Sequence, residues 1–331
     1  MFSVGRFAYR CRFGIGLLLA LLCAAGEALA DGAAQAGRTN GHTAEAIAVI
    51  YPDIGEPFRA IFAQIIEGIE DKTKVRLRSY PVGANPDIAE LNAQLKRNGT
   101  KVVIALGRQG LKAAAGLGSE IAVVAGGILS LPEADSQHLS GISLTPDPSL
   151  LFARLKNLLP AVRRVTVVYQ PQSNEWLIKL AREAAKAQGL ELLSLPAPDL
   201  ARAARLYETS FASADSRQDA VWLPQDAIAA DETIILPLIL KEAWNRGVPV
   251  FSSSLSHVKK GVLFALYPDN SELGRSLAAY ALSLLAGDAP RRGITPLRDV
   301  HMALNLRTAS HLGLTINEQQ QRSYDLVFPS P

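Results

Sequence analysis

The feature that most constrains the fold is a regular alternation of short apolar runs with helical patterns along residues 44–328. Runs such as "AIAVIYPD" (46–53) and "KVVIALG" (101–107) have the length and composition of strands buried on both faces. Segments with apolar residues at helical spacing, such as Phe58, Ile61 and Ile65, separate these runs. This alternation is typical of parallel sheets wrapped by helices. We therefore expect an α/β protein with doubly wound, Rossmann-like sheets.

The two prolines of "TPDPS" (145–149) divide the pattern into two successive sets of strands and helices. Each set has the size of an ordinary lobe. We expect a first lobe from residues 44–148 with about 252–290, and a second from residues 149–251 with about 291–328. A hinge would join the two lobes.

The stretch "GVLFALYPDNSELG" (261–274) reads as a buried strand that Pro268 closes, followed by a helix. Asp269 and Glu272 have the spacing of a capping box, and Gly287 lies where a left-handed C-terminal cap is expected. Turns of this kind occur at the carboxyl ends of strands, where open α/β sheets bind ligands. The turn therefore points to one edge of a ligand site.

Two further strands also end in a tyrosine, Tyr51 and Tyr169, at the edge that faces the expected crevice. A tyrosine in such a place can stack on a ligand and donate its hydroxyl. The alternative is that these residues only close their strands.

The first thirty residues have the pattern of a cleavable signal peptide. Three arginines precede the apolar run "IGLLLALLCAAG", and "ALA" (28–30) has the small residues of a cleavage site. We expect cleavage after Ala30 and export to the periplasm, although lipidation at Cys23 stays open as an alternative. Residues 31–43 are small and polar and read as a disordered leader.

The charge and cysteine content of the mature chain exclude several functions. The signal removes three basic residues and one acidic residue, so the net charge falls from +3 to +1. Such a balance offers no basic stripe for nucleic acid. Both cysteines, Cys11 and Cys23, leave with the signal, which excludes disulfide and thiolate chemistry.

The sequence contains no set of residues that we can assign to catalysis. It lacks a phosphate-binding Gly-Lys-Ser/Thr loop, a dinucleotide fingerprint and a Gly-x-Ser-x-Gly elbow, and its five histidines are scattered. We therefore predict no enzyme activity, no cofactor and no metal site. An enzyme of two Rossmann-like lobes, such as a glycosyltransferase, is the least favoured alternative.

Polar residues at strand ends are the candidates for a ligand site. In the first lobe, Gly107, Arg108 and Gln109 follow a buried strand and open a helix, so the backbone amides and the guanidinium can receive an anion. Arg108 can equally be a solvated surface residue. Two lobes with polar strand ends suggest a binding cleft that closes by a hinge.

In the second lobe, Asn174, Gln225 and Asp226 occupy equivalent positions, and Asp226 is a natural partner for an ammonium group. Asn174 and Asp226 can also be ordinary helix caps. Ser253 belongs to "SSSLS" (252–256), which supplies small hydroxyl donors after another strand.

The C-terminal third resembles a known family. "GVLFALYPDNSELGRSLAAYALSLLAGDAP", "MALNLRTASHLGLTI" and "YDLVF" are similar to the substrate-binding proteins of ABC importers, of the type that includes tryptophan- and tyrosine-binding members. The resemblance covers most of residues 140–328. It implies a periplasmic-binding-protein type I fold and a small organic ligand, with Tyr169, Asn174, Gln225 and Asp226 among the contacts.

The first lobe departs from the pattern of that family, because Gly107-Arg108-Gln109 stands where a Gly-Thr or Gly-Ser turn is common. An aromatic amino acid therefore cannot be assumed as the ligand. The leading hypothesis is a monomeric solute-binding protein that delivers a small polar or aromatic metabolite to an ABC permease of the inner membrane. The alternative is a periplasmic sensing module that signals to a membrane kinase or cyclase.

Overall fold

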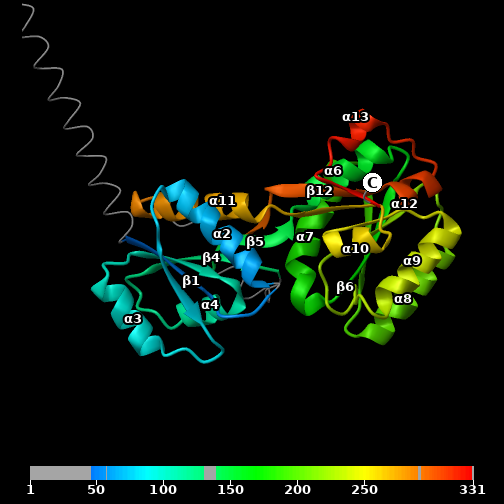
Figure 1. Ribbon diagram of the computed structural model, residues 1–331. Coiled ribbons are helices and arrows are strands. Elements are labelled where there is room, and N and C mark those ends of the chain that lie inside the picture. The colour runs from blue at the N-terminus through cyan, green and yellow to red at the C-terminus, as the bar shows by residue number, and fades with distance from the viewer. Residues whose placement is uncertain (1–45, 57, 130–138, 290–291, 330–331) are drawn as a thin grey trace, which may run out of the picture.

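The computed structural model describes residues 46–56, 58–129, 139–289 and 292–329, which form two α/β lobes (Figure 1). The predicted signal peptide and leader lie outside the described residues. Within the described part of the chain, no helix combines the length and apolarity needed to cross a membrane.

The first lobe is built on a six-stranded sheet in which all neighbouring strands run parallel. In spatial order its strands are β11 (Gly293–Leu297), β5 (Ser140–Pro146), β4 (Ala122–Ile128), β3 (Val102–Leu106), β1 (Ile47–Pro52) and β2 (Arg78–Val82). Helices α2 (Phe58–Thr73) and α11 (Asn270–Leu285) cover one face, and α3 (Ile88–Arg97) and α4 (Gly107–Ala114) cover the other. Because both faces are buried, the strands carry the continuous apolar runs seen in the sequence.

The second lobe is built on a seven-stranded sheet. In spatial order its strands are β13 (Leu326–Phe328), β12 (Val300–Asn305), β10 (Phe264–Pro268), β9 (Val250–Ser252), β8 (Asp219–Leu223), β6 (Arg164–Tyr169) and β7 (Glu191–Pro196). All pairs are parallel except β10 with β12. The predicted α/β class with two doubly wound lobes is confirmed.

The helices of the second lobe also cover both faces of their sheet. On one face lie α6 (Pro148–Leu158), α7 (Pro171–Ala187) and α12 (Leu306–His311). On the other lie α8 (Leu200–Ala212) and α9 (Ile235–Arg246). The shorter α10 (Leu255–Lys260) packs on β10 and β12, and α13 (Glu318–Gln321) follows near the end of the chain.

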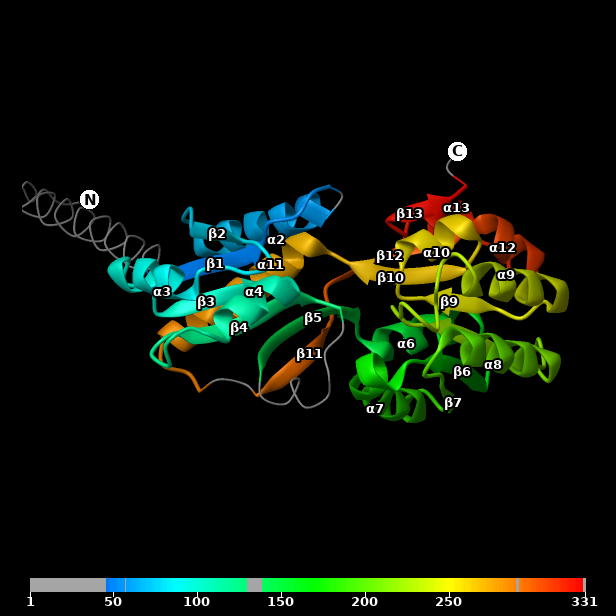
Figure 2. The ribbon, with the colours of Figure 1, turned by 90° about the horizontal axis from the view of Figure 1, so that it is seen from below.

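Among the described residues the chain crosses between the lobes three times (Figure 2). Each crossing contains an aspartate. Asp147 lies in the first crossing, Asp269 in the second and Asp299 in the third. Asp147 N–H donates to the Leu297 carbonyl at 2.8 Å, and Asp269 N–H donates to the Asp299 carbonyl at 3.1 Å. The three crossings therefore form one connected strip beside the lobes.

Two segments of the chain belong to the other lobe than the one we expected. Residues 252–268 lead into β10 of the second sheet, and β11 (Gly293–Leu297) belongs to the first sheet, whereas we expected the reverse for both. An apolar run predicts a strand but not the sheet that receives it. Only the helix α11 follows the expectation that this part of the chain returns to the first lobe.

Helix α11 reaches the first lobe because it packs very closely on α2. A Cβ atom placed on Gly68 would lie 2.0 Å from the Ser271 carbonyl oxygen, and one on Gly274 would lie 2.1 Å from the Ile65 carbonyl oxygen. Only glycine permits this approach of two backbones. The helix begins at Asp269, whose carboxylate accepts from Glu272 N–H at 3.0 Å.

The two ends of α11 largely follow the sequence prediction. Of the two hydrogen bonds of the predicted capping box, the structure shows the one that the Asp269 carboxylate accepts from Glu272 N–H. The Glu272 carboxylate pairs with Arg275 instead. Gly287, with φ at +93°, follows the end of the helix as predicted.

Candidate ligand-binding cleft

A cleft of about 670 Å³ lies between the two lobes, at the carboxyl ends of their strands. The first lobe contributes Pro52, Ile54, Phe58, Ile61, Phe62, Gly107, Arg108, Gln109, Gly127, Ile128, Leu129 and Leu144. The second lobe and the crossing after β10 contribute Gln225, Ser254, Leu255, Ser256, Tyr267, Pro268 and Asn270. Most of this lining is apolar, and the polar groups come from both sides. The volume is that of an ordinary small-molecule site.

The first-lobe wall depends on the first turn of α4. Gly107 has φ at +66°, and a Cβ atom there would lie 3.0 Å from both Phe62 and Pro52. A Cβ atom on Gly110 would lie 2.8 Å from the Ile50 carbonyl oxygen, so α4 packs directly on β1. These close approaches turn the start of α4, with its free amides, toward the cleft.

Arg108 and Gln109 carry the polar chemistry of that wall. The Arg108 side chain is exposed, and no carboxylate among the described residues pairs with it. The Gln109 Oε1 atom is buried and accepts no hydrogen bond from the described part of the chain. The first lobe therefore offers a cation and an acceptor to a molecule in the cleft.

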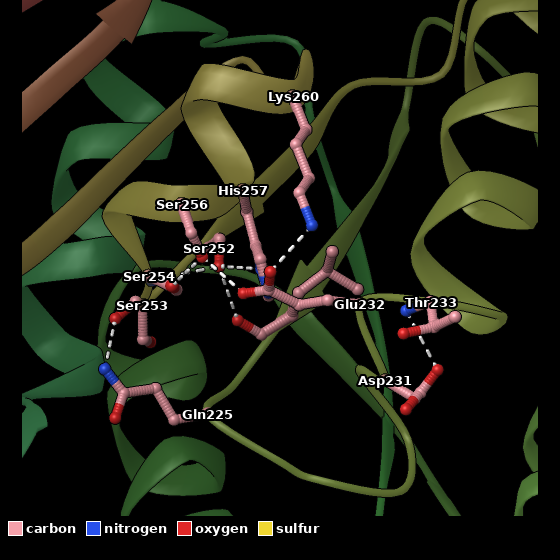
Figure 3. A network of polar contacts seen from close by, with 11 residues as sticks. Gln225, Asp231, Glu232, Thr233, Ser252, Ser253, Ser254, Ser256, His257 and Lys260 are labelled. Atoms are coloured by element: carbon pink, nitrogen blue, oxygen red, sulfur yellow. Dashed lines mark hydrogen bonds and ion pairs between the residues drawn. The ribbon is translucent and has the colours of Figure 1, made fainter.

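Gln225 and the loop after β9 form the second-lobe wall (Figure 3). Gln225 Nε2 donates to the Ser253 carbonyl at 2.9 Å, while its Oε1 is buried without a partner among the described residues. The hydroxyls of Ser254 and Ser256 lie 2.8 Å apart, and Ser256 donates to Glu232. Gln225 is thus held in place by one end of its amide, while the other end is unpaired.

Sequence reasoning selected Ser253 but missed Ser254 and Ser256. Ser253 is buried and accepts from Trp222 Nε1 at 3.3 Å, whereas its two neighbours line the cleft. The motif "SSSLS" contains all of these serines. Which of them line the cleft depends on the residue at which β9 ends, and the motif does not predict that residue.

A buried histidine supports this loop from behind. His257 Nδ1 lies 2.8 Å from Ser252 Oγ, and Ser252 Oγ also accepts from Ser254 N–H at 3.0 Å. Burial lowers the pKa of His257 below its usual value, although Glu232, 3.6 Å from Nε2, acts in the opposite direction. The hydrogen bond from Lys260 is the largest cause that lowers the pKa of Glu232, and the hydrogen bond from Ser256 acts in the same direction. Because Ser252 is fully buried, this cluster orders the loop and does not present a nucleophile.

Asp226 and Asn174 belong to an internal network of the second lobe. Asp226 Oδ2 accepts from Gln170 N–H at 2.7 Å and from Asn174 Nδ2 at 2.8 Å. Its Oδ1 accepts from Ile228 N–H at 2.9 Å and Ala229 N–H at 2.8 Å. Both residues are buried and neither lines the cleft. Asp226 therefore has a structural role, because its hydrogen bonds join the loop after β8 to the start of α7.

The tyrosines at the strand ends also lie in different surroundings. Tyr51 packs against the apolar core of the first lobe. Tyr169 is buried in the second lobe, and its hydroxyl donates to Glu175 Oε2 at 2.7 Å. Tyr267 lines the cleft. Among the predicted site residues, Gly107, Arg108, Gln109 and Gln225 therefore face the cleft, and whether they contact a ligand stays a prediction.

The described residues contain no group of three or more His, Cys, Asp or Glu side chains placed to hold a metal ion. Two α/β lobes with a cleft at their strand ends, joined by three crossings, define a two-lobed binding protein of the periplasmic-binding type I fold. The sequence model of the ABC transporter substrate-binding protein family matches residues 63–324. The chain belongs to this family, as the resemblance implied.

Solved structures of similar fold agree with this assignment. An ABC domain from Streptococcus pneumonia in complex with L-Trp is 17% identical, with a TM-score of 0.54, over 86% of this chain and 99% of that one. A substrate-binding protein with adhesive properties from Clostridium difficile, in a ligand-free, open structure, is 16% identical, with a TM-score of 0.62, over 85% and 99%. A conserved domain protein from Vibrio cholerae is 19% identical, with a TM-score of 0.54, over 85% and 99%. No curated protein sequence matched the chain.

Proposed function

We propose that this chain is an exported, periplasmic solute-binding protein of an ABC importer, which holds a small polar or aromatic metabolite between its lobes. The observation that carries the proposal is the cleft, because large apolar side chains stay exposed toward it. Phe58 is 57% exposed and Leu129 is 44% exposed, and both line the cleft. Apolar surface that a monomer leaves open beside unpaired polar groups commonly marks a ligand site.

The lining favours a ligand with an apolar body and two kinds of polar group. Phe58, Phe62 and Leu255 would pack on the body. Arg108 and the first turn of α4 would receive an anionic group, since both supply N–H donors and positive potential. The Oε1 atoms of Gln109 and Gln225, which have no hydrogen-bond partner among the described residues, would accept hydrogen bonds from ligand N–H groups. A neighbour in complex with L-Trp makes aromatic amino acids reasonable first probes.

The connections between the lobes support closure on the ligand by a hinge. The three crossings lie together, and Arg298 in the third pairs with Asp147 in the first at 2.5 Å. Because the two sheets are joined only at this strip among the described residues, a small change in its dihedral angles moves one wall of the cleft toward the other. We propose the monomer as the form that docks on its inner-membrane permease, with no catalytic step of its own.

The experiment is a thermal-shift screen of residues 31–331 against amino acids, organic acids, nucleosides and small aromatics, followed by calorimetric titration of each hit. A ligand at a hundred times its dissociation constant stabilises the fold by about 2.7 kcal/mol, which for about 300 residues is a rise in Tm of about 4–5 °C. The hit should bind at least tenfold more weakly to Gln225→Ala, because its second-lobe acceptor is lost. A screen without a hit, or a hit that Gln225→Ala and Arg108→Gln bind as well as the wild type, would contradict the proposal.

The screen does not separate transport from sensing, in which the same fold would signal to a membrane kinase or cyclase. Reconstitution with the membrane protein that the neighbouring genes encode, a permease or a sensor, makes that distinction. Ligand-loaded protein should raise the ATPase activity of an importer severalfold and should leave a sensor protein unaffected.

A further inference from the structure

A second concave site lies in the second lobe, outside the cleft. This basic groove has a volume of about 710 Å³ and is formed by α9, α10, α12 and the residues that follow β13. Its cations are Lys241, Lys259, Lys260 and Arg307, which come from three different helices. No aspartate or glutamate is among the described residues that line it. The groove thus concentrates positive charge in a chain whose mature form is nearly neutral.

Aromatic rings, not carboxylates, support two of these cations. The Arg307 guanidinium lies 5.5 Å from the centre of the Trp244 ring, and Lys259 Nζ lies 6.0 Å from the centre of the Phe328 ring. Trp244 is itself fixed by His311, which stacks on it at 3.6 Å. A ring attracts a cation without occupying its N–H donors or cancelling its charge.

Three of the four cations therefore keep their charge for an incoming group. Lys260 donates to Glu232 at 2.7 Å and is neutralised. Lys241, Lys259 and Arg307 are exposed, and within the described part of the chain no carboxylate pairs with them. Leaving three like charges around one hollow is unfavourable unless a polyvalent anion occupies it.

The chemistry of the groove favours a phosphate over a single carboxylate. A carboxylate neutralises one cation, whereas a phosphate monoester carries a charge of about −1.5 to −2 and three strong acceptor oxygens. A guanidinium binds such a group through two parallel hydrogen bonds, and lysine ammonium groups add point charges. Two of the polar side chains beside them are already engaged, since Asn305 donates to the Val258 carbonyl and Thr308 to the Gly261 carbonyl. Recognition would therefore rest on the cations, with Asn245 as a further polar group in the lining.

We propose that the basic groove binds a phosphate-bearing anion, independently of the ligand in the cleft. The phosphate has two possible sources, a soluble phosphate monoester or the monoester headgroup of phosphatidic acid at the membrane where the permease lies. Helix α10 separates the two sites, because its Leu255 and Ser256 line the cleft while its Lys259 and Lys260 line the groove. The proposal does not depend on which solute the cleft holds.

The test is calorimetric titration of residues 31–331 with inorganic pyrophosphate, and sedimentation with vesicles that contain phosphatidic acid or only phosphatidylcholine. The wild type should bind pyrophosphate or the phosphatidic acid vesicles, with affinity that falls as salt rises. Pyrophosphate binding identifies a soluble source, and binding to phosphatidic acid vesicles alone identifies a lipid headgroup. The tryptophan emission should change as well, because Trp244 is exposed while Trp176 and Trp222 are buried.

The matched variants are Lys259→Gln with Arg307→Gln, and Lys186→Gln as the control at an exposed site on α7. The double variant should lose at least tenfold in affinity and the control should lose none. Ligand binding in the cleft should be unchanged in both, which keeps this test separate from that of the solute-binding function. Equal binding by the double variant, tighter binding of citrate than of pyrophosphate, or no binding of any phosphate probe would overturn the proposal.

Discussion

The two walls of the cleft use the same kind of sequence in opposite ways. In the first lobe, Arg108 and Gln109 follow a strand and leave a guanidinium and an amide oxygen without partners among the described residues. In the second lobe, Asn174 and Asp226 also follow strands, yet they are buried and hydrogen-bonded to the protein. Gln225 lies between these cases, with one end of its amide held and the other open.

This difference teaches that a polar residue at a strand end has two distinct uses. A short acidic or amide side chain can satisfy the amides of the next turn, as Asp226 does for Ile228 and Ala229. A long side chain reaches past that turn, as Arg108 does. Side-chain length, more than the residue's position, separates loop-building residues from those that face the cleft, whereas an unpaired polar atom does not, since Asn174 Oδ1 is buried without a partner among the described residues yet lies outside the cleft lining.

The largest effect should come from removing Asp226. Replacement by alanine leaves four donors of the protein without an acceptor, so we expect the free energy of unfolding to fall by about 2–4 kcal/mol. Urea denaturation of the ligand-free protein measures the change. Asp53, an exposed aspartate after β1, is the matched control, and Asp53→Ala should change stability by less than about 0.5 kcal/mol. Similar effects of the two substitutions would remove the distinction between the walls.

Replacing Arg108 should give the reverse pattern, with a loss of binding and little loss of stability. Arg108→Gln removes a charge-assisted donor from an exposed side chain, so affinity for an anionic ligand from the screen should fall about tenfold to a hundredfold. Arg76, an exposed arginine in the same lobe, provides the control variant Arg76→Gln. Calorimetric titration and urea denaturation of both variants make the comparison. Unchanged affinity in Arg108→Gln would mean that the Arg108 guanidinium does not bind the anionic group of the ligand.

The sequence was sufficient to predict the strands and helices and the fold class, because the patterns that identify these elements are local. Period, capping and proline positions identify strands and helices one at a time, and Asp269 and Gly287 lie at the predicted ends of α11. The lobe that receives each crossing segment was not predictable, because it depends on distant contacts such as Gly68 with Ser271. Ser254 and Ser256 were missed for a similar reason, since the conformation of the loop after β9 decides which of its serines line the cleft and which, like Ser253, are buried.

The smallest effect concerns pH and the histidine behind the second-lobe wall. Burial lowers the pKa of His257 in the folded protein below the ordinary 6.5, so the unfolded chain binds the proton more tightly. Stability is therefore complete above about pH 6.5 and decreases as the pH falls from there toward the folded-state pKa. Each unit of difference between the two pKa values is worth about 1.4 kcal/mol. The pH therefore acts on the wall that His257 supports.

Urea denaturation between pH 7.5 and pH 5 tests this expectation on the wild type and on His257→Gln. Glutamine can still accept from or donate to Ser252, which lies 2.8 Å from the imidazole, but it does not titrate. The variant should start from a lower stability at pH 7.5 and lose less of it on acidification than the wild type. The substitution removes only the imidazole of His257, so the difference between the two curves reports that group. Parallel curves would show that His257 takes up its proton in the folded state without cost, and that the loop carrying Ser254 and Ser256 does not need the neutral imidazole.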